Sequence, residues 1–245
     1  MLMFAGISWP DLLAPVVYLA LWIGYAAVAD NPARGRSTLM HRMHQYRAVW
    51  FSRMVRRDNR IVDTQITTLL SQNISFFASN TILIIGGLLA VLGARDQVIG
   101  VLADIPLVTN TSAMLFEAKV LLLLVTFVYA FFKFTWAVRQ FNYVAIMIGA
   151  APQPAEADEP AALRFIERTA QVASRAADHS NKALRAYYFG LAALGWFVDA
   201  WLFMALTLWV VIVVWRREYR SATLAMLGPT DTPIEGAPSP LSSRR

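Results

Sequence analysis

The sequence of 245 residues is unusual first for what it has little of. It contains no cysteine, which excludes disulfides, thiolate metal sites and cysteine nucleophiles. Only 16% of its residues are charged, against about 25% in soluble domains, while 57% are hydrophobic. A chain of this composition is suited to a solvent that is largely lipid, and its length allows one membrane domain with modest loops.

Long apolar runs replace the missing charge. The longest is Tyr187–Trp215, which contains one charged residue, Asp199, and exceeds the roughly 20 residues that a helix needs to cross a bilayer. Similar runs recur along the chain. We therefore predict an all-α integral membrane helical bundle with about four transmembrane helices and additional amphipathic helices on the cytoplasmic side.

The apolar runs define the expected organisation of one membrane domain, residues 1–225. Met1–Pro10 lacks the positive residues of a cleavable signal, so we expect the first span to be retained. The remaining predictions are a basic amphipathic segment at 34–60, a cytoplasmic helix at 160–187 and a disordered Pro/Ser-rich tail at 226–245. The expected spans are 12–29, 73–92, 113–136 and 188–215.

Two of these spans have alternatives. The third either continues to residue 150 as one long tilted helix through Arg139, or leaves the membrane there. The fourth is favoured as a single crossing because its apolar run is continuous. It could instead dip in and turn back near Gly195-Trp196, because irregular backbone is tolerated at depth when protein shields it.

The distribution of Lys and Arg predicts the orientation, since these residues mark cytoplasmic loops. The segment 34–60 carries eight arginines, the connection 94–112 carries one, and the segment 160–187 is again basic. The N-terminus is therefore expected on the periplasmic side of a bacterial inner (plasma) membrane. Four crossings would place the C-terminus there too, which conflicts with Arg216, Arg217 and Arg220 directly after the last span.

The net charge of +6 predicts a lipid surface as a partner and not nucleic acid, because the arginines stand beside apolar spans. In segment 34–60, Leu39, Met43, Tyr46, Trp50 and Met54 follow helical spacing, so this helix can lie in the headgroup layer. The alternative is a helix that packs on its own domain. The candidates for contact with anionic headgroups are Arg36, Arg42, Arg47, Arg53, Arg56, Arg57 and Arg60.

A polar face marks the start of the second span. Its members recur at spacings of three and four, which places them on one side of a helix: Gln65, Thr68, Gln72, Ser75 and Ser79. Polar side chains facing lipid are costly, so this face should meet protein or water. Helix–helix packing is the favoured interpretation, and a hydrated path is the alternative.

Asp199 is the one acid deep in a predicted span, and intramembrane charges are candidate functional residues. Its possible partners are Lys133 and Arg139 on the third span, although Lys133 could snorkel to the interface. A structural ion pair or a protonated acid is the alternative. We expect no cofactor, no metal site and no catalytic residue, since none of the familiar fingerprints is present.

Three segments together resemble a known family. They are DTQITTLLSQNISFFASNTILIIGGLLAVLG from Asp63, FFKFTWAVRQFNYVAIMIGAAP from Phe131, and RAYYFGLAALGWF from Arg185 followed by RREYRSATL. This set is similar to an uncharacterised multi-pass membrane family of proteobacteria and plants, classed as a domain of unknown function. The resemblance covers most of Ile7–Ala225, implies about four spans, and supplies no activity, ligand or site residue.

Three functions compete on these observations. The first is a non-enzymatic scaffold or accessory component with a membrane-protein partner or a second copy of itself. The second is an oligomeric channel or transporter that uses the polar face and Asp199. The third is an anionic-lipid-binding protein that uses the arginine-rich segment.

Overall fold

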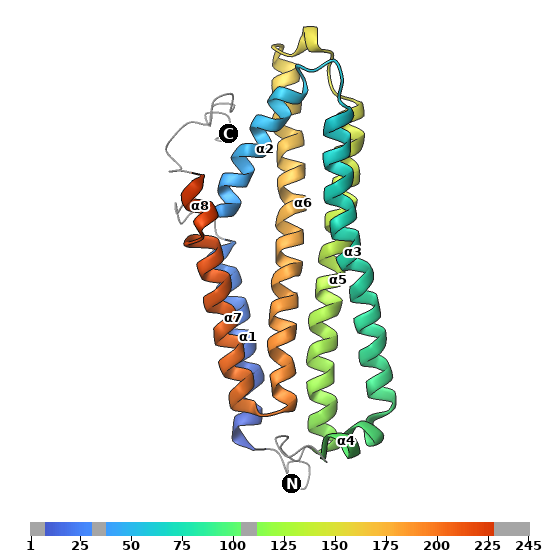
Figure 1. Ribbon diagram of the computed structural model, residues 1–245, viewed down its shortest axis with the longest axis vertical. Helices are drawn as coiled ribbons and strands as arrows, with labels where there is room; N and C mark the ends of the chain where they lie inside the picture. The colour runs from blue at the N-terminus through green and yellow to red at the C-terminus, as the bar shows by residue number, and fades with distance from the viewer. Residues whose placement is uncertain (1–7, 31–37, 104–111, 228–245) are drawn as a thin grey trace. The chain divides into compact units, whose positions relative to one another are not determined.

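The computed structural model describes residues 8–30, 38–103 and 112–227. Within these ranges every regular element is helical, which confirms the predicted all-α class (Figure 1). Short 3-10 turns occur at Pro154–Glu156 and Leu194–Phe197. The α-helices are α1 Trp9–Ala29, α2 Leu39–Met54, α3 Ile61–Gly93, α4 Arg95–Ala103, α5 Ala113–Gly149, α6 Pro160–Ala193, α7 Ala200–Tyr219 and α8 Ala222–Met226.

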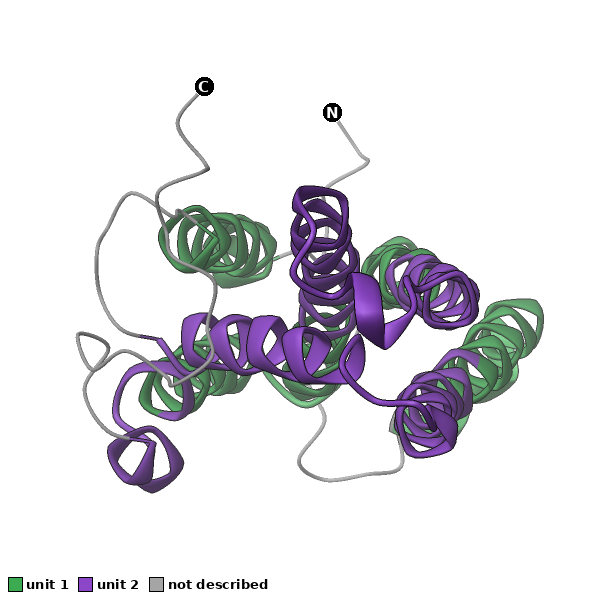
Figure 2. Cartoon of the chain, turned by 90° about the horizontal axis from the view of Figure 1, so that it is seen from above, with its two compact units in different colours: residues 1–35, 79–132, 183–216 green, residues 36–78, 133–182, 217–245 purple. Residues whose placement is uncertain are grey.

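The chain forms two compact units, and α3, α5 and α6 contribute residues to both (Figure 2). Unit 1 consists of residues 1–35, 79–132 and 183–216, and unit 2 of residues 36–78, 133–182 and 217–245. Each unit therefore combines parts of the chain that are far apart in sequence.

Four helices are long and apolar enough to cross a membrane, in agreement with the predicted membrane protein: Trp9–Ala29, Ile61–Gly93, Ala113–Gly149 and Ala200–Met226. Two of these helices are longer than a crossing of the bilayer requires. At 33 and 37 residues, α3 and α5 are about 50 and 55 Å long, whereas the hydrocarbon core is about 30 Å thick. Unless they tilt steeply, part of each helix lies outside the hydrocarbon.

The core of unit 1 is rich in aromatic side chains. Tyr18, Phe189 and Phe203 are fully buried, and the rings of Tyr18 and Phe189 meet edge-on at 5.6 Å. Trp196 stacks on Phe203 with ring centroids 5.2 Å apart. Such pairs add about 0.5–1.5 kcal/mol each beyond burial of their area, so they fix this interior firmly.

Contacts within unit 1 establish how its helices run. Rings of Trp9 and Trp201 bring the starts of α1 and α7 together, and those of Tyr25 and Trp215 bring their ends together. The two helices are therefore parallel. The turn 194–197 makes the unit 1 part of α6 antiparallel to α7.

Unit 2 has a separate apolar core. Phe51 and Met54 of α2 are fully buried and belong to one cluster with Val144 of α5 and Ile166 of α6. Thr38 caps α2 by accepting a hydrogen bond from the His41 N–H at 3.0 Å. These buried residues pack one face of α2 against the rest of unit 2, and contact of its exposed face with headgroups stays a prediction.

The predicted crossing at 188–215 is wrong as a single span. α6 ends at Ala193, a 3-10 turn follows, and α7 begins at Ala200. The chain therefore turns back near Gly195-Trp196, as the alternative proposed. A Cβ at Gly195 would lie 2.7 Å from the Leu206 side chain, so glycine is what allows α7 to pack this closely over the turn.

Other boundaries also differ from the predictions. α3 begins at Ile61, so the helix that carries the polar face starts 12 residues before the expected span 73–92. α5 is one continuous helix through Arg139 to Gly149, which decides between the two alternatives for the third span. The basic segment is helical at 39–54, and α6 starts at Pro160 as expected. The predicted tail lies outside the described residues from Gly228 onward.

Candidate functional site

Asp63 is a fully buried carboxylate at the first turn of α3, in unit 2. Its Oδ1 accepts hydrogen bonds from Trp50 Nε1 and from Arg57 Nη1, both at 2.7 Å. Its Oδ2 is buried and meets no hydrogen-bond donor among the described residues. Arg57 remains 42% exposed, so this pair lies at the edge of the core, where α2 and α3 meet.

Several of the arginines predicted to contact lipid are committed to the protein itself. Arg42 is buried and donates to Gln45 Oε1 at 2.7 Å and to the Leu227 carbonyl at 3.2 Å. Arg60 donates to the carbonyls of Ala151 and Pro152, and Arg56 to Asp158. These contacts tie α2 and the start of α3 to the rest of unit 2, so they stabilise the fold.

Arg47 and Arg53 are the remaining candidates in the described chain, since Arg36 lies outside it. Arg53 is exposed. Arg47 is partly buried, and its Nη1 is buried without a hydrogen-bond acceptor among the described residues. Burial lowers the pKa of Arg47, and the nearby charge of Asp178 opposes that shift. A buried guanidinium nitrogen in this state has unused capacity to bind an anion.

The middle of α6 carries a charged cluster in unit 2. Asp178 Oδ1 lies 2.9 Å from His44 Nε2 of α2. The neighbouring His179 packs its ring edge-on to Trp136 of α5 at 6.5 Å. Burial lowers the pKa of His179, and the positive charges of Lys133 and other nearby residues lower it further, while Asp178 opposes them. His179 is therefore held in its neutral form near pH 7.

Asp199 does not lie in the middle of a span. It precedes α7 in unit 1, where its Oδ1 accepts from the backbone N–H groups of Trp201 at 2.8 Å and Leu202 at 3.3 Å. This is the geometry of a helix N-cap. The prediction of a deep intramembrane acid is wrong because the turn at 194–197 brings this residue to the end of a helix.

A buried lysine accompanies Asp199. Lys119 of α5 is 1% exposed, and its ammonium lies 5.8 Å from the centre of the Trp196 ring. Trp196 Nε1 in turn donates to Asp11 Oδ1 of α1 at 3.0 Å. Lys119 was not among the predicted site residues. Its link to the first helix could not be found from spacing, because these residues are more than 70 positions apart.

Lys133 and Arg139, proposed as partners of Asp199, have other surroundings. Both belong to unit 2, whereas Asp199 belongs to unit 1. Lys133 is close enough to His179 to lower its pKa. Arg139 is exposed, and its Nε donates to Tyr143 Oη at 2.7 Å.

The ion pair between Arg185 and Asp30 in unit 1 was not predicted. Arg185 of α6 is 7% exposed and donates to both carboxylate oxygens of Asp30, each at 3.2 Å. The Arg185 guanidinium also lies 5.3 Å from the centre of the Tyr25 ring, in a cation–π contact. Asp30 was not among the predicted site residues, because sequence spacing gives no sign of a partner 155 residues away.

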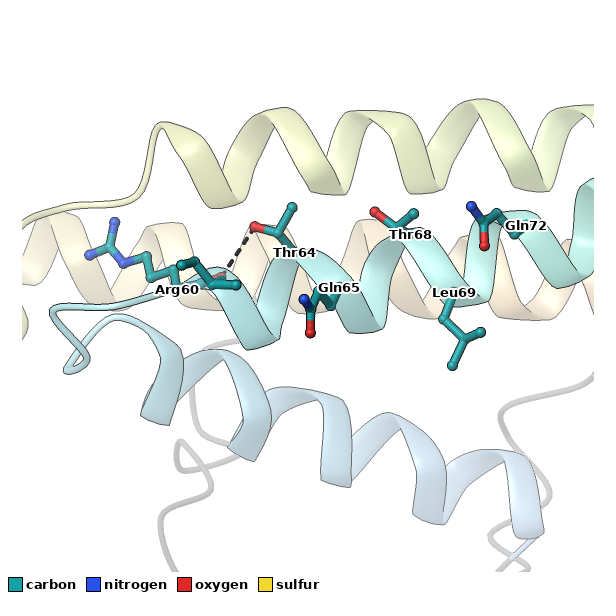
Figure 3. Close-up of a pocket in the computed structure, with 7 residues that line it drawn as sticks. Arg60, Thr64, Gln65, Thr68, Leu69 and Gln72 are labelled. Atoms are coloured by element: carbon teal, nitrogen blue, oxygen red, sulfur yellow. Dashed lines mark hydrogen bonds between the residues drawn. The ribbon is translucent and has the colours of Figure 1, made fainter.

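The polar face of α3 lies on the surface. Gln65, Thr68 and Gln72 are exposed, and Ser75 is half-buried, all in unit 2, while exposed Ser79 belongs to unit 1. Figure 3 shows Thr64 and Thr68 on one side of the helix and Gln65 and Leu69 on another. A groove of about 680 Å³ runs along these side chains from Arg60 to Gln72. Helix–helix packing was the favoured interpretation of this polar face. Its most exposed residues, Gln65, Thr68 and Gln72, do not pack against another helix among the described residues.

No group of three or more His, Asp or Glu residues within the described ranges is arranged to hold a metal ion. What the geometry does offer is a set of internal charge pairs and an exposed polar face.

The family described as "Protein of unknown function, DUF599" matches residues 13–223. The chain belongs to this family. No curated protein and no solved structure matches the DUF599 chain.

Membership of the DUF599 family agrees with the resemblance drawn from the three sequence segments, all of which lie within or across the matched range. The family's description assigns no activity and no role to any residue, and the membrane character rests on the four apolar helices of this chain.

Proposed function

We propose that the DUF599 chain is a non-enzymatic scaffold or accessory protein of a bacterial inner membrane. Unit 1 would anchor it and unit 2 would present a helical surface. The observation that carries this proposal is the length of α3 and α5, about 50 and 55 Å, which exceeds the hydrocarbon thickness of about 30 Å. Unit 2 has its own core and internal charge pairs, so it can serve as a stable platform.

The directions of the helices in unit 1 support the orientation that we propose. Five helical segments alternate there: α1, the unit 1 parts of α3, α5 and α6, and α7. Because α1 and α7 are parallel, Arg216 and Arg217 follow α7 at the end where α1 finishes. The arginines of segment 34–60 also follow the end of α1. With these ends cytoplasmic and Trp9 periplasmic, the arginine-rich segment 34–60 and Arg216 and Arg217 would all lie on the cytoplasmic side, as the positive-inside rule expects.

The surface that we assign to a membrane-protein partner lies on α5 in unit 2. Trp136, Tyr143 and Ile146 are 46%, 40% and 69% exposed, and their spacing, with Arg139, places them on one face. Trp, Tyr and Arg are enriched at binding surfaces because they bury large areas while keeping polar contacts.

Site-specific photo-crosslinking in intact cells tests the scaffold. A photoreactive amino acid at Ile146 should give one abundant protein adduct, and the matched probe at Trp209, exposed on α7 in unit 1, should give none of the same mass. Absence of any discrete adduct at Ile146 and Tyr143 would overturn the proposal. Solute flux through liposomes that carry the pure protein would instead favour the transport alternative.

A second candidate, binding of anionic lipid, rests on Arg47. Its buried Nη1 lacks an acceptor among the described residues, so a headgroup phosphate could supply one. Native mass spectrometry should show fewer retained anionic lipids for Arg47→Gln than for wild type. Arg53→Gln, at an exposed arginine of the same helix, is the matched control and should lose fewer. Equal retention in all three proteins would count against this role.

A further inference from the structure

A groove runs along the seam between α6 and α7 in unit 1. Its volume is about 270 Å³, and the residues that line it all belong to unit 1. Small buried side chains lie at its floor, including Ala192 at 3% and Val214 at 5% exposed. Large exposed side chains form its rims, Leu191 on α6 and Trp209 and Val213 on α7. We name this hollow the α6/α7 groove.

The lining of the α6/α7 groove suits an apolar occupant. Apart from the Tyr188 hydroxyl and the Trp209 indole N–H, the side chains that line it are aliphatic. Its α7 wall belongs to Ala200–Met226, one of the four helices that are apolar enough to cross a membrane. Water in such a hollow would find few polar partners, and an empty hollow would forfeit van der Waals contacts. Hydrocarbon satisfies both conditions.

The size of the groove separates a protein helix from a lipid chain. A helix with its side chains is about 10 Å wide and rises 5.4 Å per turn, so one turn takes up roughly 400 Å³. That volume exceeds the whole α6/α7 groove, so a helix would rest on the rims at Leu191 and Trp209 and leave the floor unfilled. An acyl chain is a single file of methylene groups, and it can enter between the rims.

A basic residue stands at one end of the groove. In α7, Trp209, Val213 and Arg216 follow one another at spacings of four and three, so Arg216 lies on the same face one turn beyond the lining. Leu206, which packs over Gly195 in the turn after α6, marks the opposite end. Arg216 is exposed, and no ion pair ties it to another described residue. It is therefore available to a charged group outside the chain.

We propose that the α6/α7 groove binds one acyl chain of an anionic phospholipid, and that Arg216 binds the phosphate of its headgroup. A lipid tail gains no hydrophobic free energy on leaving the bilayer for an apolar groove, so preference must come from close packing and from the headgroup. A planar guanidinium is suited to phosphate because it donates two parallel hydrogen bonds. An anionic headgroup is favoured because it carries no ammonium that offsets the phosphate charge.

This inference requires unit 1 to lie in a bilayer, and it depends neither on the scaffold partner nor on Arg47, because those proposals concern unit 2. In the orientation that we propose, Arg216 faces the cytoplasmic leaflet, where anionic lipids give the membrane a negative surface. A protein helix in the groove is the competing occupant, and the experiment below distinguishes it from lipid.

Site-specific photo-crosslinking in nanodiscs of equal parts phosphatidylglycerol and phosphatidylcholine tests the groove in the full-length protein. A photoreactive amino acid at Leu191, on the rim, should give lipid adducts in which phosphatidylglycerol is in excess by about fivefold, the effect of one arginine near an anionic headgroup. The matched probe at Leu208 should show the composition of the bulk bilayer. Leu208 is 50% exposed on α7, against 57% for Leu191, and does not line the groove.

Filling the groove should remove the excess of phosphatidylglycerol at Leu191. Val213→Trp places a large ring between the rims, where an added side chain competes with the lipid chain for the same space. Ile212→Trp is the matched control and should keep the excess. Ile212 is the preceding residue of α7, is 44% exposed against 45% for Val213, and does not line the groove.

Removing the arginine should have the same effect without filling the groove. Arg216→Gln should bring the lipid ratio at Leu191 to that of the bulk bilayer. Arg53→Gln, at an exposed arginine of unit 2, removes the same charge from the chain and should keep the excess.

Three outcomes would overturn the proposal. The first is an equal lipid ratio at Leu191 and Leu208, a comparison that needs no further substitution and so does not depend on the folding of any variant. The second is a protein adduct as the main product at Leu191, which would assign the groove to a partner helix. The third is a tryptophan or glutamine variant that behaves like its matched control.

Discussion

The carboxylate of Asp199 accepts a hydrogen bond from the backbone N–H of Trp201 at 2.8 Å, and this contact starts α7. The residue therefore acts as a cap on a helix and not as an isolated charge within a crossing. The distinction matters because the transport alternative depended on Asp199 as an ion-carrying group.

Asp199→Asn should leave stability almost unchanged, because Asn caps a helix about as well as Asp. Asp199→Ala should lower the free energy of unfolding by about 1 kcal/mol, since the cap is lost. Steric-trapping measurements in detergent micelles would compare the two. Equal destabilisation by both variants would show that the charge of Asp199, for example toward Lys119, matters more than the cap.

The sidedness of the chain can be mapped with single cysteines. Asp96→Cys, on exposed α4, should react with an impermeant maleimide from the periplasmic side. Glu159→Cys and Arg220→Cys, both exposed, should react only after the membrane is permeabilised. If 188–215 were one crossing, Glu159 and Arg220 would label from opposite sides, so labelling of that kind would contradict the five alternating segments of unit 1.

The pair Arg57–Asp63 should respond unequally to its two single substitutions. Arg57→Ala leaves the fully buried Asp63 carboxylate with only Trp50 as a donor, at an expected cost of about 3 kcal/mol. Asp63→Asn should cost less, about 1–2 kcal/mol, because Arg57 is 42% exposed and can turn to water. Unfolding free energies of the two variants provide the comparison. The reverse order would mean that Asp63 is not desolvated.

The Asp30–Arg185 pair joins α1 to α6 in unit 1 and should be coupled. Asp30→Asn and Arg185→Gln are each expected to cost about 1–3 kcal/mol, because each leaves a charged group with fewer partners. The double variant should cost less than the sum of the two. A double-mutant cycle with an additive result would show that the 3.2 Å contacts carry no net energy.

His179 makes the stability of unit 2 sensitive to acid. Burial and the charges of Lys133, Lys182 and Arg175 lower its pKa in the folded protein, so the unfolded chain binds the proton more readily. Stability is therefore fully present above the unfolded pKa of about 6.5 and declines as the pH falls toward the folded value. His41, whose pKa is lowered by burial and by the charges of His44 and Arg42, acts in the same direction.

His179→Gln should flatten this decline between about pH 7 and pH 5. Thermal unfolding of wild type and variant over that range measures the difference. A variant whose midpoint falls as steeply as that of wild type would assign the acid sensitivity to His41 or to the carboxylates. A steeper fall would contradict the direction of the His179 shift.

The sequence predicted the positions of the helices better than the roles of the candidate functional residues. Polarity and length were enough to find α1 and α5, and Pro160 correctly marked the start of α6. The candidate residues were less reliable, because their role depends on what lies opposite. Arg42 and Arg60, predicted to contact lipid, donate to protein carbonyls, and Gln72, expected to pack, is exposed.

The sequence by itself determined that much of this protein is surrounded by lipid. Low charge and long apolar runs permit a helical membrane protein and little else, because backbone polar groups in lipid must be satisfied within each helix. The tertiary structure decided where the chain turns. The run from Tyr187 to Trp215 is continuously apolar, so no periodicity could reveal the break at 194–199. Packing of Leu206 over Gly195 and capping by Asp199 make that turn, and contacts of this kind are not visible in a linear pattern.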